Sequence, residues 1–149
     1  MDLPKVFVDT SFWIAYFNSL DSNHEKAKKW LKRLKYNPAI LITSDFIVVE
    51  TLNCFIKCKK LNLFRRKEIA KKFYDSWFQR YSPLRELVRI NNEIWDESAR
   101  IYFLYKDKEF SFTDCTSFIL MEKIGTRLAA HFDQHFNQAS MINVIDHWQ

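Results

Sequence analysis

The sequence predicts an α/β fold of three layers, with helices on both faces of a central, mostly parallel sheet of four to five strands. Short apolar runs of strand length alternate along the chain with longer segments of helical periodicity, a pattern typical of strand–helix–strand units. The runs within 5–9 and 39–43 are continuously apolar, as expected for strands that a parallel sheet buries on both faces.

The expected elements of the first half follow from capping residues and breakers. A strand at 5–9 leads into a short helix at 12–18, and a turn precedes an amphipathic helix at 24–35 that Pro38 ends. The second strand, 39–43, is followed by a helix at 46–59 with a polar cap at its start. This last helix is apolar on nearly all sides, which predicts that it is buried.

The second half repeats the alternation. Asparagine and hydroxyl residues are placed to cap its helices, and Gly125 is placed to end one of them. The expected elements are a basic amphipathic helix at 65–81, a short strand at 86–90, helices at 93–105 and 114–124, a strand at 126–132, a short helical turn at 133–138 and a strand at 141–145.

The composition predicts one globular domain spanning residues 1–149. Of the 149 residues, 48% are hydrophobic and 17% aromatic, which supports a packed core rather than disorder. Gly125 is the single glycine, so Gly-rich dinucleotide loops and Walker phosphate loops are excluded. The three cysteines lie in apolar segments and are expected to be buried free thiols of a reducing compartment: Cys54, Cys58 and Cys115.

The charge balance is basic, with a formal charge of +5 and a pI near 9.1. This suits an anionic partner such as nucleic acid, and equally a soluble protein with a lysine-rich surface. No leader segment precedes the first strand, and no apolar run is long enough to cross a bilayer. We therefore expect a cytoplasmic protein that does not contact a membrane.

Four acidic residues stand where exposed charge is not expected. Asp9 ends the first buried strand, Asp133 ends the strand at 126–132, and Asp114 opens an apolar helix. Glu50 lies one turn into the helix at 46–59, among apolar neighbours. Because strand ends and the starts of the following helices share one edge of a parallel sheet, Asp9, Asp114 and Asp133 are expected to meet there, with Glu50 within side-chain reach.

Each acid also has a separate explanation. Asp9 could cap a helix, Asp114 could interact with a helix dipole, and Asp133 could be a turn residue. Glu50 could pair with a lysine or arginine. One shared divalent cation accounts for all four, because close carboxylates otherwise repel one another. Oxygen ligands favour Mg²⁺ or Mn²⁺ over zinc.

With these acids in place, the sequence resembles the PIN-domain ribonucleases, of the kind found as toxins in bacterial toxin–antitoxin pairs. The resemblance covers nearly the whole chain and rests on four motifs in order. These are Val8-Asp9-Thr10-Ser11 followed by Trp13-Ile14-Ala15, Thr43-Ser44 through Val49-Glu50, Ser111-Phe112-Thr113-Asp114 followed by Ser117, and Phe132-Asp133-Gln134-His135-Phe136.

The resemblance implies a Mg²⁺- or Mn²⁺-dependent endoribonuclease that hydrolyses RNA phosphodiester bonds. It implies catalytic, metal-binding acids at Asp9, Glu50, Asp114 and Asp133, with polar neighbours that orient water or substrate at Thr10, Ser11 and Ser117. It also implies an RNA substrate, an antitoxin protein partner and a homodimer. The alternative is a module of the same fold that binds RNA or protein without cleaving.

The fourth motif departs from the family pattern. His131 stands where a Thr or Ser usually precedes the fourth aspartate, and Asn137-Gln138-Ala139-Ser140 replaces a segment that commonly contains glycine. These departures bear on the role of Asp133 more than on that of the other three acids.

Other chemistries fit the sequence less well. An aspartyl phosphatase needs a second aspartate where Ser11 stands. His131 and His135 are four residues apart and could share a helix face as zinc ligands, but without further soft ligands two surface histidines are expected. The densest basic stretch could follow an RNA backbone or form a solvated helix face. It comprises Lys57, Lys59, Lys60, Arg65, Arg66, Lys71 and Lys72.

Overall fold

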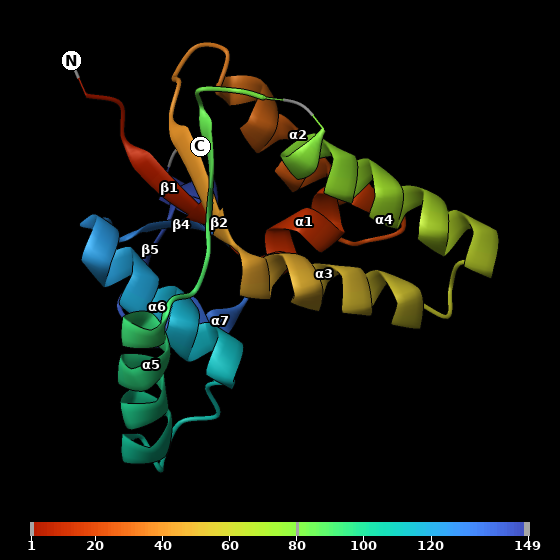
Figure 1. Ribbon diagram of the computed structural model, residues 1–149. Coiled ribbons are helices and arrows are strands. Elements are labelled where there is room, and N and C mark those ends of the chain that lie inside the picture. Colours follow the sequence, from red (N-terminus) through yellow and green to blue (C-terminus); the bar gives the residue numbers. More distant parts are fainter. Residues whose placement is uncertain (1, 80, 148–149) are drawn as a thin grey trace.

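The computed structural model describes residues 2–79 and 81–147 and contains one sheet of five parallel strands in the order β3-β2-β1-β4-β5 (Figure 1). The predicted α/β class with a parallel sheet is therefore confirmed. The elements are β1 (Lys5–Val8), α1 (Thr10–Phe17), α2 (His24–Arg33), β2 (Ile40–Ser44), α3 (Asp45–Lys57), α4 (Leu63–Phe78), β3 (Arg85–Val88), α5 (Asn92–Leu104), α6 (Phe112–Ile124), β4 (Leu128–Ala130), α7 (Gln134–Gln138), β5 (Ile142–Asn143) and α8 (Val144–His147).

Strand β1 lies at the centre of the sheet. Val6, Phe7 and Val8 have no exposed surface. In the register of the sheet, Phe7 is paired with Ile42 of β2 on one side and with Ala129 of β4 on the other. The continuous apolar run in the sequence follows from this position, because both faces and both edges of β1 are covered.

The chain adds strands in one direction from β1 to β3, and then crosses to the other side of β1 to add β4 and β5. Since crossovers between parallel strands are right-handed, α1 to α4 cover one face and α5 to α7 the other (Figure 1). The reversal leaves a crevice at the carboxyl ends of β1 and β4. Open parallel sheets bind their ligands at such a point.

The caps predicted from the sequence occur at most helix starts. Ser44 accepts a hydrogen bond from the backbone N–H of Ile47, and Asn91 from that of Ile94. Gly125 ends α6 in the left-handed conformation, with φ of 74°. Among the described residues, no helix combines the length and apolarity needed to cross a bilayer.

The end of the chain differs from the prediction. The strand expected at 126–132 is shorter, and the strand expected at 141–145 contains only β5 followed by the helical turn α8. Asn143 starts this turn, because its side-chain oxygen accepts a hydrogen bond from the N–H of Ile145 at 3.0 Å. Residue 80, within the helix expected at 65–81, lies outside the described residues.

Helix α3 is not buried on all sides, as its composition had suggested. Val49 is 57% exposed, and Cys54 is exposed on the same helix. Of the other two cysteines, Cys58 is half-buried and Cys115 is buried, so the expectation of three buried thiols is wrong. Cys54 borders a pocket instead of the core.

Candidate active site

A pocket of about 520 Å³ opens at the carboxyl edge of the sheet, at the crevice between β1 and β4. It brings together six of the seven residues predicted from the sequence: Asp9, Thr10, Ser11, Glu50, Asp114 and Asp133. The seventh, Ser117, is not among the described residues that line it. Ser117 lies one turn after Asp114 on α6, is fully buried, and donates its hydroxyl to the carbonyl oxygen of Thr113 at 3.1 Å.

Hydroxyl groups that follow β1 hold two of the acids. Asp9 Oδ2 accepts hydrogen bonds from the backbone N–H of Ser11 at 3.1 Å and from its hydroxyl at 2.6 Å. Glu50 Oε2 accepts a hydrogen bond from the Thr10 hydroxyl at 2.6 Å. The Ser11 oxygen also accepts the N–H of Phe132 at 2.9 Å, which ties the end of β1 to the segment after β4. Thr10 and Ser11 therefore position the carboxylates.

The other two acids are held at helix starts. Asp114 Oδ2 accepts the backbone N–H of Ser111 at 3.0 Å in a reciprocal cap of α6. Asp133 Oδ1 accepts the backbone N–H of His135 at 2.9 Å and caps α7. The capping role considered from the sequence for Asp9 is thus real, and Asp114 and Asp133 also cap helices, but each cap uses only one carboxylate oxygen.

The second oxygen of each of the four carboxylates is free. In the described part of the chain, no hydrogen bond reaches Asp9 Oδ1, Asp114 Oδ1 or Asp133 Oδ2, and the same holds for Glu50 Oε1. None of the four acids forms an ion pair with a lysine or arginine there. Four carboxylate oxygens that no lysine or arginine neutralises are suitable ligands for a hard divalent cation.

The electrostatics of the pocket point the same way. Burial raises the pKa of Asp9 to about 7, and repulsion from Glu50 and Asp114 adds to this against the hydrogen bonds from Ser11. Burial also raises the pKa values of Glu50 and Asp114, and the Asp133 carboxylate contributes to both increases. A bound cation would relieve both the repulsion and the cost of burying these charges.

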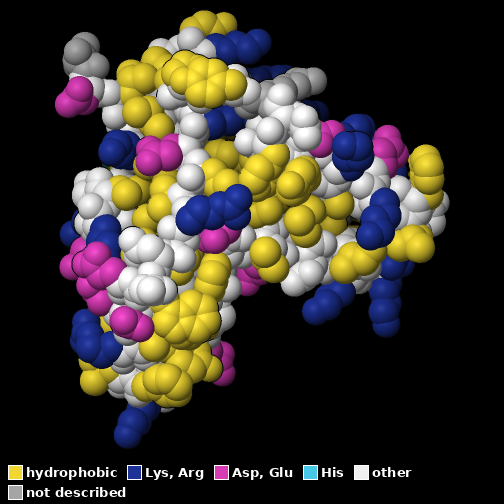
Figure 2. All heavy atoms as spheres, in the orientation of Figure 1, with side chains coloured by type: hydrophobic (Ala, Val, Ile, Leu, Met, Phe, Trp, Pro, Cys, Tyr) yellow, Lys and Arg dark blue, Asp and Glu magenta, His cyan; other side chains and the backbone are white. Residues whose placement is uncertain are grey.

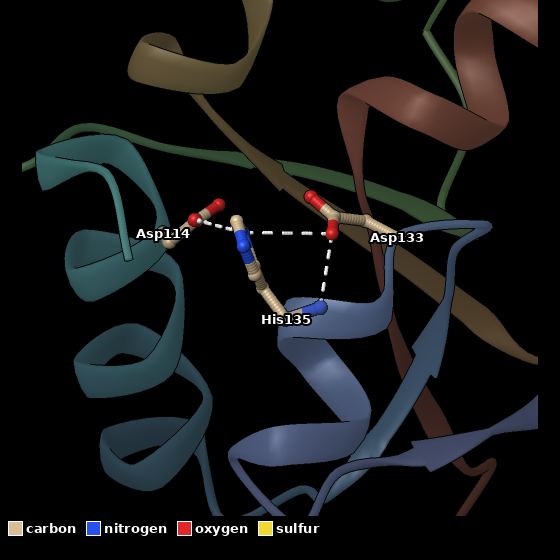
Figure 3. A group of neighbouring side chains, drawn as sticks. All are labelled: Asp114, Asp133 and His135. Carbon is tan, nitrogen blue, oxygen red and sulfur yellow. Dashed lines mark hydrogen bonds and ion pairs between the residues drawn. The ribbon is translucent and has the colours of Figure 1, made fainter. Parts of the chain in front are cut away.

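His135 is a pocket residue that the sequence analysis did not select. Figure 3 shows its imidazole, carried by α7, between Asp114 and Asp133. Its Nδ1 atom lies 3.0 Å from Asp114 Oδ2 and 3.5 Å from Asp133 Oδ1. One ligand atom from each of these three residues lies within 4.8 Å of the others, close enough to share a metal ion. The sequence analysis had considered it only as a zinc ligand beside His131, although it stands two residues after Asp133 in the fourth motif.

His131 does not pair with His135, and the expectation of two surface histidines is wrong. His131 directly follows β4 and not a helical turn, and its side chain is 1% exposed. Its ring stacks on Phe136, with centroids 4.8 Å apart. Burial lowers the pKa of His131 to about 4, so that the ring is neutral at pH 7. The position two residues before the fourth aspartate is thus filled by a core residue, which packs against Phe136 of α7.

Comparison with known proteins identifies the family. The sequence pattern of the PIN domain family matches residues 6–141. The 23S rRNA-specific endonuclease VapC20 of Mycobacterium tuberculosis is 28% identical to this chain over 140 residues, which cover 93% of this chain and 97% of VapC20. The residues that match the family pattern include all four of the acidic motifs.

Solved structures show the same fold. The crystal structure of M. tuberculosis VapC20, titled a Sarcin-Ricin loop cleaving toxin, matches with a TM-score of 0.75 and 26% identity, over 93% of this chain and 98% of that one. FitAcB from Neisseria gonorrhoeae matches in fold, with a TM-score of 0.62 and 16% identity over 93% of this chain and 94% of that one. These comparisons favour the predicted ribonuclease over a module without cleavage activity. By its sequence pattern and its fold, the chain belongs to the PIN domain family.

Proposed function

We propose that this protein is a metal-dependent endoribonuclease that hydrolyses RNA phosphodiester bonds and acts as the toxin of a toxin–antitoxin pair. The observation that carries the proposal is the convergence of four carboxylates, each with one anchored and one free oxygen, on a single pocket at the switch point of the sheet. The similarity to VapC20 makes 23S rRNA the first substrate to test.

In this proposal the free oxygens of Asp9, Glu50, Asp114 and Asp133 hold one or two Mg²⁺ or Mn²⁺ ions. The bound cation supplies a water of lowered pKa and stabilises negative charge on the phosphate. Ser11 and Thr10 keep Asp9 and Glu50 in place, and His135 holds Asp114 through its Nδ1 atom. Such supporting contacts matter, because metal affinity depends strongly on the groups that orient the ligands. Ser117 supports the first turn of α6 from the core side.

The partners follow from the toxin class. We propose that an antitoxin protein inhibits the enzyme and that the functional unit is a homodimer. We also propose that the enzyme cleaves its RNA in the cytoplasm. The antitoxin rests on the similarity to VapC20, which is a toxin, whereas the dimer and the cytoplasm rest on the resemblance to toxins of this family. Purification together with the product of an adjacent small reading frame would test the antitoxin, and ultracentrifugation would test the dimer.

The basic stretch of the sequence has two parts with different surroundings. Arg65, Lys71 and Lys72 form ion pairs along the exposed side of α4. Arg66 donates hydrogen bonds to the carbonyl oxygens of Leu61 and Ile56. In contrast, three lysines that form no ion pair in the described part of the chain line a groove of about 700 Å³, which shares Ile14, Asp21 and Cys54 with the acidic pocket. They are Lys57, Lys59 and Lys60. Of the residues in the basic stretch, we propose that only these three contact the RNA backbone.

Removal of the metal tests the central proposal. The purified protein is expected to cleave 23S rRNA when Mn²⁺ or Mg²⁺ is present, to lose this activity in EDTA, and to regain it when the metal is restored, because the four acids cannot activate water by themselves. Calorimetry should detect Mn²⁺ binding to the wild-type protein. Cleavage that persists in EDTA would contradict the mechanism, and an absence of both cleavage and divalent binding would favour the inert module.

A triple variant in which Lys57, Lys59 and Lys60 are all replaced by alanine is expected to bind RNA more weakly. Its RNA affinity is also expected to depend less on salt concentration. Each phosphate contact of single-stranded RNA contributes about 0.7 to the slope of log affinity against log salt, so the slope should fall by about 2. The binding of a short labelled RNA in EDTA, followed by fluorescence anisotropy at several salt concentrations, measures this. The matched control replaces Arg65, Lys71 and Lys72, which removes the same charge. Equal slopes for the two variants would show that the groove lysines have no special role.

A further inference from the structure

Helix α2 and the helical turn α8 enclose a pocket that the proposed mechanism does not use. It has a volume of about 360 Å³ and is lined by Lys26, Lys29, Trp30, Arg33 and Ile145. Trp30 and Ile145 are 3% and 4% exposed and belong to the core, so they form a fixed floor. The two lysines are exposed and the arginine is half-buried. We call this site the basic pocket.

The positive charges of the basic pocket are not neutralised by the protein. In the described part of the chain, the side chains of Lys26, Lys29 and Arg33 form no ion pair and no hydrogen bond. No acid is among the described residues that line the pocket. Three cationic groups therefore surround one concave surface and are free to bind an anion.

The acids that adjoin these residues in the sequence have other partners. Glu25 pairs with Lys28 at 3.4 Å, and the Asp146 carboxylate accepts a hydrogen bond from the Asn143 amide at 3.2 Å. Glu25 is also the single acid of α2, which contains five lysines and arginines among its ten residues. The helix therefore has a formal net charge of +4, and the basic pocket lies on the most positive part of its surroundings.

The start of α2 connects the basic pocket with the acidic pocket. Asn23, the N-cap of α2, lines the acidic pocket. Lys26 and Arg33 follow it by three and by ten residues, spacings that place them over the same side of the helix. At ~1.5 Å per residue, Arg33 lies roughly 15 Å from Asn23 along the helix axis. A polymer that leaves the acidic pocket over the start of α2 can therefore reach the basic pocket.

We propose that the basic pocket is a second binding site for the RNA substrate, which holds backbone phosphates at a distance from the scissile bond. The inference rests on the proposed ribonuclease function. Ammonium and guanidinium groups bind phosphate oxygens, and the planar guanidinium of Arg33 can contact two of them at once. An RNA long enough to occupy both sites is bound more tightly than either site alone would bind it.

The chemistry of the basic pocket favours RNA over a protein as the occupant. Interfaces between proteins are depleted in lysine and centre on apolar and aromatic side chains. Figure 2 shows such hydrophobic side chains gathered at the surface over the lower part of α5, away from α2. In the basic pocket the apolar residues are buried and the accessible groups are cations, which suits a chain of phosphates.

The test compares two double variants of equal net charge. Lys26→Ala/Lys29→Ala removes two lysines of the basic pocket, and Lys32→Ala/Lys35→Ala removes two exposed lysines of the same segment that do not line it. The binding of a folded, fluorescein-labelled fragment of 23S rRNA is measured by anisotropy in EDTA at several salt concentrations. Because both variants lose the same charge, the long-range attraction falls equally, and a difference between them reports direct contacts.

Each phosphate contact contributes about 0.7 to 0.9 to the slope of log affinity against log salt. The slope of Lys26→Ala/Lys29→Ala should therefore be about 1.5 lower than that of the control variant, which should stay close to the wild type. In Mn²⁺ its KM for the same fragment should rise while kcat is unchanged, because neither changed residue lines the acidic pocket.

Equal salt slopes for the two double variants would overturn the inference, because the pocket lysines would then contribute only general charge. A Lys26→Ala/Lys29→Ala protein that binds the fragment normally, but no longer purifies with the product of the adjacent reading frame, would overturn it as well. The basic pocket would in that case bind a protein.

The inference and the proposed function can fail separately. RNA cleavage in Mn²⁺ by two double variants with equal salt slopes and equal KM would sink the second site and leave the nuclease intact. Unequal slopes in a protein that never cleaves would leave the second site and sink the nuclease.

Discussion

An Asp9→Asn protein is expected to lose RNA cleavage and yet to be more stable than the wild type when no metal is present. Asp9 Oδ1 is the free oxygen of the most deeply buried acid in the pocket, and an amide is a poor ligand for a divalent cation. Substitution of a group that only supports a metal ligand lowers metal affinity or activity by up to about 100-fold. Loss of a direct ligand should therefore lower the rate of Mn²⁺-dependent cleavage at least as much.

The gain in stability follows from the pKa of Asp9. The difference between its ordinary value of 3.8 and about 7 in the folded protein corresponds to about 4 kcal/mol. The folded protein holds the proton more tightly than the unfolded chain, so this cost is absent below pH 3.8, grows between 3.8 and 7, and is complete above 7. An asparagine avoids it and still accepts the N–H of Ser11 as a helix cap, with a loss of about 1 kcal/mol from the weaker bond.

Urea unfolding in EDTA should therefore find Asp9→Asn about 3 kcal/mol more stable than the wild type at pH 8, with the difference shrinking toward zero at pH 4. Asp21→Asn is the matched control, because Asp21 lines the same pocket but does not contribute to the raised pKa of Asp9. It should show neither effect. An Asp9→Asn protein that cleaves RNA normally would sink the mechanism, and one that is destabilised at pH 8 would show that Asp9 is mainly structural.

Replacing Phe12 with alanine is expected to lower the free energy of unfolding by about 4 kcal/mol, within the usual range for removing a buried phenylalanine. Phe12 has no exposed surface. Its ring lies 5.3 Å from that of Trp13 and 5.4 Å from that of Trp30, and it stacks on Phe132 at 6.4 Å, again between centroids. The cavity would open directly beneath the crevice, between α1, α2 and the segment after β4.

Urea unfolding at a pH where the wild type folds reversibly measures this change. Phe64→Ala serves as the control, because Phe64 is 79% exposed and its loss should change the free energy of unfolding by less than about 0.5 kcal/mol. A Phe12→Ala protein within 1 kcal/mol of the wild type, as read from its denaturation midpoint, would show that the aromatic cluster repacks around the lost ring.

Local signals in the sequence were sufficient for the class of fold and for the order of its elements. Strand β1 is recognisable because both of its faces are covered, so every residue from Val6 to Val8 is apolar. The acids that end β1 and begin α6 were recognisable because they interrupt apolar segments at the sheet edge where a site is expected. Each of these signals depends only on chain neighbours and on the regular geometry of strands and helices.

Other features depend on which surfaces meet in three dimensions. Apolar periodicity says that α3 has an apolar side, but not whether that side packs on the core or borders a pocket, and Cys54 was misassigned for this reason. His135 and His131 have the same side chain four residues apart, yet one lies between two carboxylates and the other is stacked in the core.

The same limit applies to the basic residues. The sequence shows one lysine- and arginine-rich stretch, and only the tertiary structure shows that Lys57, Lys59 and Lys60 line a pocket, whereas Arg65, Lys71 and Lys72 pair with acids of their own helix. The chain alone thus specifies which segments are strands and helices and which acids end them, because period and capping are properties of neighbouring residues. Packing decides which of the remaining polar groups reach the pocket, because that depends on contacts between segments far apart in the chain.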